Sequence, residues 1–345
     1  MRPSFHPRLV NGPLGDPVLF VPFFYEKRAL LFDMGDLHRL PPKEILKLTH
    51  GFVTHTHMDH FAGFDTLLRT FLGRQKALHV FGPPNFLQNV EGKLASYTWN
   101  LVENYSHGFS LKATEVHPTY TISKVYDCKK EFRSNEAPHK APFDGTLLAE
   151  SAFSIDAIHL HHKIPCLGFN LKEQFHVNIM KDGLRRLEIP VGPWLRRFKE
   201  ALYEERNPEE GFQVVWKEAG KERKVDFRLG DLAEQIARIS PGQKITYIVD
   251  VIFSPENAKK IIEFARDADQ LFIETAFLDA EIDVAREKYH LTAKQAGILA
   301  KKAGVKQFTP FHFSPRYSHT EHLLQEEADR AFAGVACSRQ KPTHL

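Results

Sequence analysis

Apolar residues recur with two different periods along this chain. Short runs of consecutive or alternating apolar residues predict strands, and segments with apolar residues about every 3.6 positions predict helices. The predicted strands are 18–21, 29–32, 51–54, 77–81, 153–155, 245–249, 270–273 and 307–309, and the predicted helices are 61–72, 86–91, 255–268 and 293–303. Because strands occur in both halves of the chain among helices, the pattern predicts an α/β fold with two sheets packed face to face and helices outside.

Two segments interrupt this alternation and are expected to be insertions in a single domain spanning residues 1–345. Residues 120–145 are polar, contain Pro138 and Pro142 and show no sustained period, so we expect an irregular surface segment. Residues 172–228 are longer and highly charged, and we expect an arm that projects from the body and binds substrate. The arm carries arginines that can contact phosphates, but acidic residues lie close by, so a solvated helix of mixed charge is an equal alternative.

The composition excludes several classes of protein. A chain of 345 residues that is 42% hydrophobic can bury a substantial core, and a net charge of +3 is too small to indicate a polybasic nucleic-acid binder. The strongest apolar run, 18–25, is broken by Pro22 and is too short to span a bilayer. The three cysteines, Cys128, Cys166 and Cys337, are far apart and are expected to be buried thiols in a reducing compartment. We therefore expect a soluble, cytoplasmic protein that does not enter membranes.

The chemistry concentrates in a histidine-rich segment. The chain holds 19 histidines, and three of them occur with a carboxylate in His55-Thr56-His57-Met58-Asp59-His60, directly after a predicted strand. Extended geometry places His55 and His57 on the same side, where both can reach one metal, while Asp59 and His60 turn toward a neighbouring metal. The alternative is a solvated histidine-rich turn, but histidine is neither a favoured turn residue nor a core filler. The segment therefore predicts a metal site.

This H-x-H-x-D-H pattern resembles the signature of the metallo-β-lactamase superfamily. The resemblance implies an αββα sandwich of two mixed sheets and two divalent metal ions. It also implies that Asp33 supports the metal loop and that Asp250 bridges both metals. The spacing to Gly168 and Phe169 in the family pattern identifies His162 as the third histidine ligand of the first metal. His159 and His161 stay open between a supporting role and coordination. The implied ligands are His55, His57, Asp59, His60, His162, Asp250 and His312.

Within the superfamily, residues from about 29 to 317 most resemble the ribonuclease Z family, which removes the 3′ trailer from precursor tRNA. Tyr289-His290-Leu291-Thr292 is similar to the family's Gly-His-Ser-(Ser/Thr), whose histidine assists catalysis. Glu274 matches the glutamate that orients this histidine, and Arg316 lies in an ending similar to Ser-x-Arg-Tyr. Without the family's spacing, His290 would be interpreted as an exposed residue at a helix N-terminus, and with that spacing catalysis is favoured.

The resemblance implies a mechanism and partners. Metal-activated hydroxide would attack the phosphodiester, Asp59 would hold or deprotonate it, and His290 would protonate the leaving oxygen. Zinc is the default ion, with manganese or iron as alternatives. Precursor tRNA would be the substrate of a homodimer, contacted by Arg196, Arg197 and Arg316.

Four departures from the family pattern keep other substrates open. The family's glycine-rich opening is replaced at residues 9–17, Ile273 occupies the position of a histidine, Tyr289 occupies that of a glycine, and residues 120–145 are an added segment. The alternative is a two-metal hydrolase of a small phosphodiester or cyclic nucleotide. A binding protein without catalysis is a third hypothesis, which the complete ligand set disfavours.

Overall fold

The first sheet is built from the N-terminal part of the chain. The computed structural model describes residues 5–24, 26–134 and 137–334. The strands lie in sequence order, and β3 to β6 are parallel to one another while the outer strands pair antiparallel. The sheet comprises β1 (Arg8–Leu9), β2 (Leu19–Pro22), β3 (Ala29–Phe32), β4 (Leu48–Phe52), β5 (Lys76–Gly82), β6 (Phe109–Val116), β7 (Tyr120–Asp127) and β8 (His139–Pro142).

The second sheet has the order β18-β17-β16-β11-β10-β9. Its strands β16, β17 and β18 are parallel, and the long hairpin of β10 and β11 lies beside them antiparallel. The sheet comprises β9 (Thr146–Ala149), β10 (Phe153–His162), β11 (Ile164–Glu173), β16 (Lys244–Ile248), β17 (Gln270–Glu274) and β18 (Phe308–Phe311). The predicted strands 29–32, 51–54 and 270–273 thus correspond to β3, β4 and β17.

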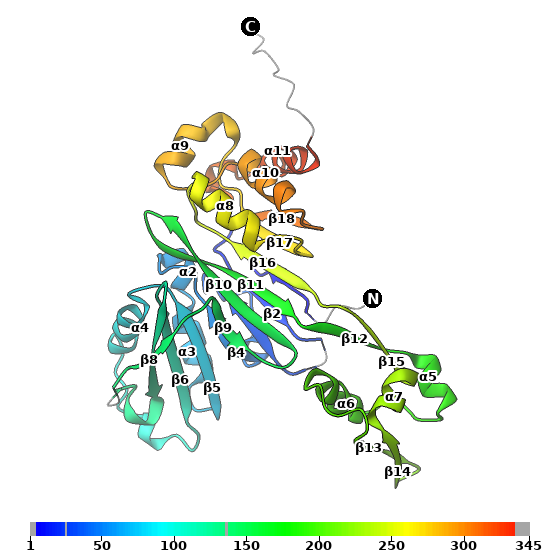
Figure 1. Cartoon of the computed structure of the whole chain (residues 1–345). Helices are drawn as coiled ribbons and strands as arrows, with labels where there is room; N and C mark the ends of the chain where they lie inside the picture. Colours follow the sequence, from blue (N-terminus) through cyan, green and yellow to red (C-terminus); the bar gives the residue numbers. More distant parts are fainter. Residues whose placement is uncertain (1–4, 25, 135–136, 335–345) are drawn as a thin grey trace.

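The hydrophobic core forms in layers between and outside these sheets. Phe32 and Phe52 of the first sheet pack against Phe169 and Tyr247 of the second in one buried cluster. Helices α3 and α4 cover the outer face of the first sheet, and α8 and α10 cover the outer face of the second (Figure 1). The predicted αββα sandwich is therefore confirmed. The helices of the body are α1 (Pro42–Ile45), α2 (Met58–Phe61), α3 (Phe64–Phe71), α4 (Phe86–Ala95), α8 (Pro255–Phe264), α9 (Ile282–Glu287), α10 (Ala293–Ala303) and α11 (Glu321–Ala333).

Helix boundaries follow local chemistry. Thr292 caps α10 in a reciprocal capping box with Gln295, and Gly304 ends the helix in the left-handed conformation. The predicted helix 61–72 is divided into α2 and α3 at Gly63. A Cβ on Gly63 would lie 2.1 Å from the Gly35 carbonyl oxygen, so only glycine allows this close approach.

The prediction of an irregular segment at residues 120–145 was wrong. Its described residues form β7 and β8, which extend the first sheet beyond β6. β7 pairs with β6, and β8 pairs with β7, through main-chain hydrogen bonds. Such bonds do not require apolar residues to alternate along the added strands, so the sequence pattern did not reveal them. The proline at the end of β8, Pro142, is tolerated because β8 is an edge strand.

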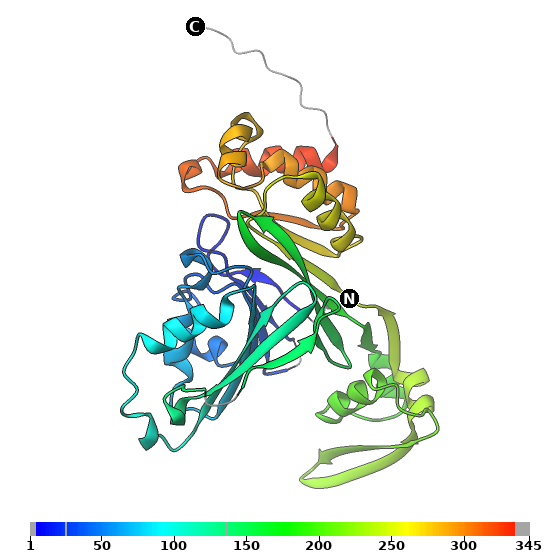
Figure 2. The same ribbon diagram turned by 60° about the vertical axis from the view of Figure 1, so that its left-hand side comes forward.

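The expected arm projects from the body in both views (Figure 2). An antiparallel ribbon of β12 and β15 connects it to the sandwich, and Trp194 and Phe198 lie in a buried cluster of its own. The structure extends the arm to Pro241, beyond the predicted end at residue 228, because α7 and β15 close the same cluster. The arm comprises β12 (Phe175–Ile179), α5 (Lys181–Arg186), α6 (Trp194–Tyr203), β13 (Gly211–Glu218), β14 (Lys221–Arg228), α7 (Leu229–Ile236) and β15 (Ala237–Pro241).

Two further expectations concern the membrane and the thiols. Among the described helices, none combines the length and apolar character needed to cross a bilayer. Cys128 and Cys166 are buried thiols, as predicted, and Cys337 lies outside the described residues.

Candidate metal centre

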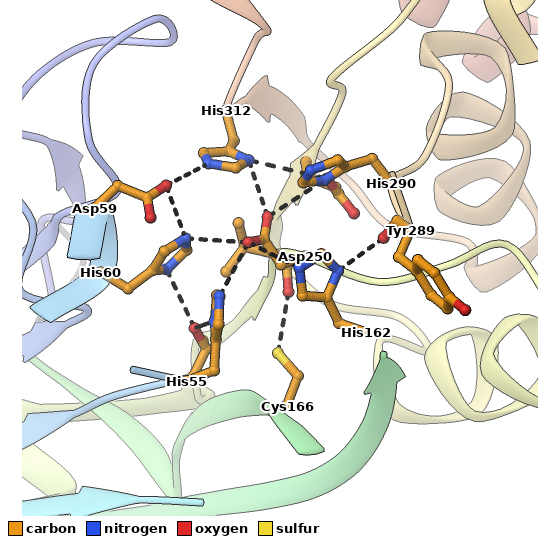
Figure 3. Close-up of polar contacts among 12 residues, drawn as sticks. His55, Asp59, His60, His162, Cys166, Asp250, Tyr289, His290 and His312 are labelled. Carbon is orange, nitrogen blue, oxygen red and sulfur yellow. Dashed lines mark hydrogen bonds and ion pairs between the residues drawn. The ribbon is translucent and has the colours of Figure 1, made fainter. Parts of the chain in front are cut away.

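The candidate site lies where strand ends of the two sheets meet. The histidine-rich segment follows β4, Asp250 lies two residues after β16, and His312 directly follows β18, and both of these strands belong to the second sheet. His162 ends β10 and faces the same space (Figure 3). Because parallel strands present their carboxyl ends at one edge, residues up to 257 positions apart in sequence converge there.

Three groups of side chains there can hold metal ions. Within each group the potential ligand atoms lie within 4.8 Å of one another. Asp250 belongs to two of the groups, and its Oδ2 also lies 3.2 Å from His60 Nε2 of the third. The structure thus brings together all seven residues that the sequence analysis expected as ligands. The groups are His55, His57, His162 and Asp250; Asp59, His60 and His312; and Asp250, Glu274, His290 and His312.

Buried polar atoms in these groups fit a cation. His55 Nε2, His60 Nε2, His312 Nδ1 and Asp250 Oδ1 are buried, and none has a hydrogen-bond partner among the described residues. Such atoms are costly unless something satisfies them, and imidazole nitrogens and carboxylate oxygens are ordinary ligands of divalent metals. The fold and these donor groups can therefore bind metal ions.

One buried carboxylate orients histidines of two groups. Asp33 follows β3 in a left-handed conformation (φ 56°) and accepts hydrogen bonds from the Thr54 hydroxyl, from Tyr247 and, at 2.9 Å, from His60 Nδ1. The Thr54 hydroxyl in turn accepts from His55 Nδ1 at 3.1 Å. With both Nδ1 atoms donating, both Nε2 lone pairs face the metal position. Asp33 thus supports the site and belongs to none of the donor groups, as expected.

Other rings are held in different ways. The Tyr289 carbonyl accepts a hydrogen bond from His162 Nδ1 at 2.8 Å, so His162 also presents Nε2 to the site. His312 has the opposite orientation, with Nδ1 3.0 Å from Asp250 Oδ1 and Nε2 3.4 Å from Asp59 Oδ2. Within the group of Asp59, His60 and His312, His60 therefore presents Nε2, whereas both nitrogens of His312 lie beside carboxylates.

The electrostatics of the site favour positive charge. Burial opposes the ionisation of Asp250 and of Asp59, but the neighbouring His312 and His60 hold the pKa of both carboxyls well below the usual range. Burial likewise opposes protonation of His60 and His312, yet Asp33 beside His60 and Asp250 beside both raise their pKa well above the usual value. Protons and metal ions therefore compete for the same ring nitrogens.

His290 and Glu274 form a pair beside this centre. The Glu274 side chain is fully buried, and its Oε2 lies 2.7 Å from His290 Nδ1, while its Oε1 accepts the Val251 amide at 2.7 Å. Burial opposes protonation of His290, but Glu274 raises the pKa of its imidazole above the usual value. The raised pKa favours the protonated ring, which is the form that can donate a proton.

The expected substrate contacts lie outside the donor groups. Arg196 on α6 pairs with Glu200 at 2.8 Å, and Arg197 donates to the Gln213 carbonyl. Arg316 pairs with Glu281, and its guanidinium lies 5.3 Å above the Phe277 ring. Binding RNA phosphates would require Arg196 and Arg316 to exchange a carboxylate for a phosphate.

The two histidines left open make contacts outside the donor groups. His159 Nε2 lies 3.1 Å from the Val116 carbonyl oxygen, and His161 is held through its main chain by Asn257. Neither belongs to a donor group in the described part of the chain.

Cys166 lies nearby, but its thiol is directed at the Val249 carbonyl, and burial raises the pKa of that thiol well above the usual value.

The sequence analysis missed Thr54, Tyr247, Asn257 and the Tyr289 carbonyl. Thr54 directly precedes His55 and could have been included with the motif. Asn257 follows Ser254-Pro255, a helix-start signal, but nothing in that signal indicates a contact with His161. The roles of Tyr247 and of the Tyr289 carbonyl leave no local sequence signal, because their partners are distant in the chain.

Comparisons with known proteins find relatives by sequence, although no family model matches the chain. It is 28% identical over 299 residues to ribonuclease Z of Deinococcus radiodurans, which covers 85% of this chain and 84% of that protein. It is 29% identical over 298 residues to ribonuclease Z of Bacteroides fragilis, with coverage of 85% and 80%.

Solved structures establish the architecture. The metallo-β-lactamase fold protein YhfI from Bacillus subtilis aligns with a TM-score of 0.54 at 16% identity, over 94% of this chain and 92% of that one. Unliganded yeast PDE1 aligns with a TM-score of 0.51 at 9% identity, over 95% and 93%. The resemblance recognised in the sequence is thus confirmed: the chain has the metallo-β-lactamase fold, and its sequence is similar to proteins named ribonuclease Z over most of its length.

Proposed function

We propose that this chain is a two-metal phosphodiesterase that cleaves the 3′ trailer from precursor tRNA. The observation that carries the proposal is the position of Asp250, shared between donor groups, with the buried Glu274–His290 pair beside it. Similarity to proteins named ribonuclease Z supports the RNA substrate.

In this proposal His55, His57, His162 and Asp250 hold one ion, and Asp59, His60, His312 and Asp250 hold the other. Two bound divalent ions, with zinc the default for nitrogen and oxygen ligands and manganese or iron as alternatives, supply an activated water and neutralise charge on the phosphate oxygens. Asp59, which is half exposed beside His60 and His312, accepts the proton of the attacking water. His290 donates a proton from Nε2 to the leaving oxygen, and Glu274 fixes its ring through Nδ1.

The test is cleavage of a precursor tRNA with a 3′ trailer by zinc-loaded protein, with products mapped to the nucleotide. We expect one metal-dependent cut directly after the discriminator base. Asp59→Ala should lose it, and Asp36→Ala, which removes an exposed carboxylate of the neighbouring loop, should retain it. An intact precursor, in a preparation that hydrolyses a simple phosphodiester, would contradict the tRNA assignment and retain the two-metal site.

A second candidate is a hydrolase of a small phosphodiester or cyclic nucleotide. The favouring observation is that arginines of the arm pair with carboxylates of the arm, as in Arg206 with Glu210 and Arg228 with Glu209. Phosphates of an RNA must compete with these partners, whereas a small ester needs no arm. Charge reversal at Arg197 separates the candidates, because it should weaken cleavage of precursor tRNA and leave hydrolysis of the small ester unchanged.

The homodimer and the cytoplasmic location remain predictions. The homodimer is expected only from the resemblance, in which the arm of one subunit serves the substrate of the other. Sedimentation at micromolar concentrations measures it directly, and a monomer that cleaves precursor tRNA at full rate would contradict it.

A further inference from the structure

Tyr289 occupies a backbone position that suits glycine. It lies between α9 and α10 with φ of 62°, in the left-handed region, where a Cβ is unfavourable. The similar family motif has glycine at this place. The same conformation follows α5 at Glu188 and α6 at Glu205 in the arm, so it is an ordinary way to end a helix in this chain. What needs an explanation is the aromatic side chain at this helix end, beside His162.

The contact with His162 does not explain the tyrosine. It is made by the main-chain carbonyl, which accepts from His162 Nδ1 at 2.8 Å. Any residue in this conformation offers the same carbonyl, and glycine would offer it without strain. The aromatic ring therefore has a separate role.

The ring lies beyond His162 as seen from Asp250, and it is directed away from Asp250 (Figure 3). It is half-buried, with its centroid 5.9 Å from that of His161 and 6.5 Å from that of His162, both edge to face. Its hydroxyl makes no hydrogen bond to any residue of the described chain. Figure 3 shows Tyr289 on the same side of Asp250 as His290, opposite Asp59.

We propose that the Tyr289 ring stacks on the base of the nucleotide that carries the leaving oxygen. The inference rests on the proposed function, in which His290 protonates the leaving oxygen and Asp59 lies on the attacking side. Because Tyr289 directly precedes His290 and both lie on that side, a nucleotide whose oxygen reaches His290 would have its base within reach of the ring. An aromatic ring stacks on any base, so the contact selects a nucleotide over a simple phosphate ester without reading its sequence.

The test compares Tyr289→Gly and Tyr289→Phe with the unchanged protein. Tyr289→Gly removes only the ring, since glycine adopts φ of 62° freely and keeps the carbonyl that holds His162. A matched control is Tyr97→Ala, which removes an exposed tyrosine next to α4. Each protein is given precursor tRNA with an intact discriminator nucleotide and the same RNA with an abasic one, and KM and kcat are measured separately.

We expect Tyr289→Gly to raise KM for the intact RNA by about ten-fold with kcat nearly unchanged, because stacking is lost equally from the bound substrate and the transition state. The abasic RNA should be cleaved equally by this variant and the unchanged protein, and Tyr289→Phe should behave as the unchanged protein. The melting temperature of Tyr289→Gly should not fall, which excludes misfolding as the cause.

Two results overturn the inference in distinguishable ways. If the unchanged protein cleaves both RNAs with the same KM, or if Tyr289→Gly weakens both equally, stacking is refuted and the proposed function stands. If the unchanged protein cleaves neither RNA, the proposed function fails, and this inference fails with it.

Discussion

Replacing Asp33 by asparagine should impair one metal position more than the other. The Asp33 carboxylate accepts from the Thr54 amide at 2.7 Å and from His60 Nδ1 at 2.9 Å. An asparagine of the same shape keeps its oxygen toward the Thr54 amide. In the reverse orientation its NH2 group would face the Thr54 N–H, and both of these groups are donors. In the favoured orientation the NH2 group faces His60, so His60 Nδ1 becomes an acceptor and the proton moves to Nε2. A protonated Nε2 cannot coordinate.

The magnitude follows from the role of such supporting contacts. Loss of the partner of a metal-bound histidine typically weakens metal affinity 10- to 100-fold, about 1.4–2.8 kcal/mol. We expect this loss at the position of Asp59, His60 and His312. The position of His55, His57 and His162 should change little, because Thr54 can still donate to the asparagine oxygen and accept from His55.

The assay is competition for zinc against a chromophoric chelator, with metal content measured after dialysis in zinc buffers. The unchanged protein should hold two ions, and Asp33→Asn should retain one under conditions that release the other. Asp36→Asn is the control, because Asp36 is exposed and bonds His38 instead of the site. Two unchanged affinities, or two equally weakened ones, would refute the reasoning about the His60 tautomer.

Three further predictions concern other parts of the molecule. His290→Ala should lower kcat roughly 10²- to 10⁴-fold with metal content unchanged, and loss of an ion would instead make His290 a ligand. Metal at 100 times its Kd stabilises a folded protein by about 2.7 kcal/mol, so a chelator that removes it should lower the melting temperature in a dose-dependent way. An unmoved melting curve would contradict metal binding at the buried cluster. Burial lowers the pKa of His50 to about 4 and that of His79 to about 3. Below pH 6.5 the unfolded chain therefore binds more protons than the folded chain does. The free energy of unfolding should fall as the pH drops from 6.5 toward 4, on the order of 3 kcal/mol for each histidine. Urea unfolding across that range should show a shallower fall for His79→Gln than for the unchanged protein, and parallel curves would refute the assignment.

The metal-binding segment was predictable because its geometry is local. His55, His57, Asp59 and His60 lie within six residues after a strand, and both the strand and the alternation of side chains follow from nearby sequence. Asp250 carries no such signal. A single carboxylate after a strand is usually a turn or cap residue, and only its place in a family series marked it for the metal site.

The remainder depended on partners that the local sequence does not specify. Strand β7 pairs with the edge of β6 and β8 pairs in turn with β7, and the residues of both strands show little alternation. The buried role of Tyr247 depends on the sandwich bringing its hydroxyl to Asp33 across the two sheets. Periodicity therefore identifies the layers better than the contacts that connect them.

Backbone conformation links the fold to the chemistry. Asp33, Asp250 and His312 each follow a strand, and each has φ between 54° and 57°, a conformation that turns the chain sharply at the edge of its sheet. Left-handed residues other than glycine cost about 1 kcal/mol or more, and they persist only when surrounding contacts hold them. The Asp33 hydrogen bonds and the packed layers on either side supply those contacts at the end of β3. The left-handed turns at Asp33, Asp250 and His312 therefore end their strands at the edge where the two sheets meet, which is the edge that carries the donor groups.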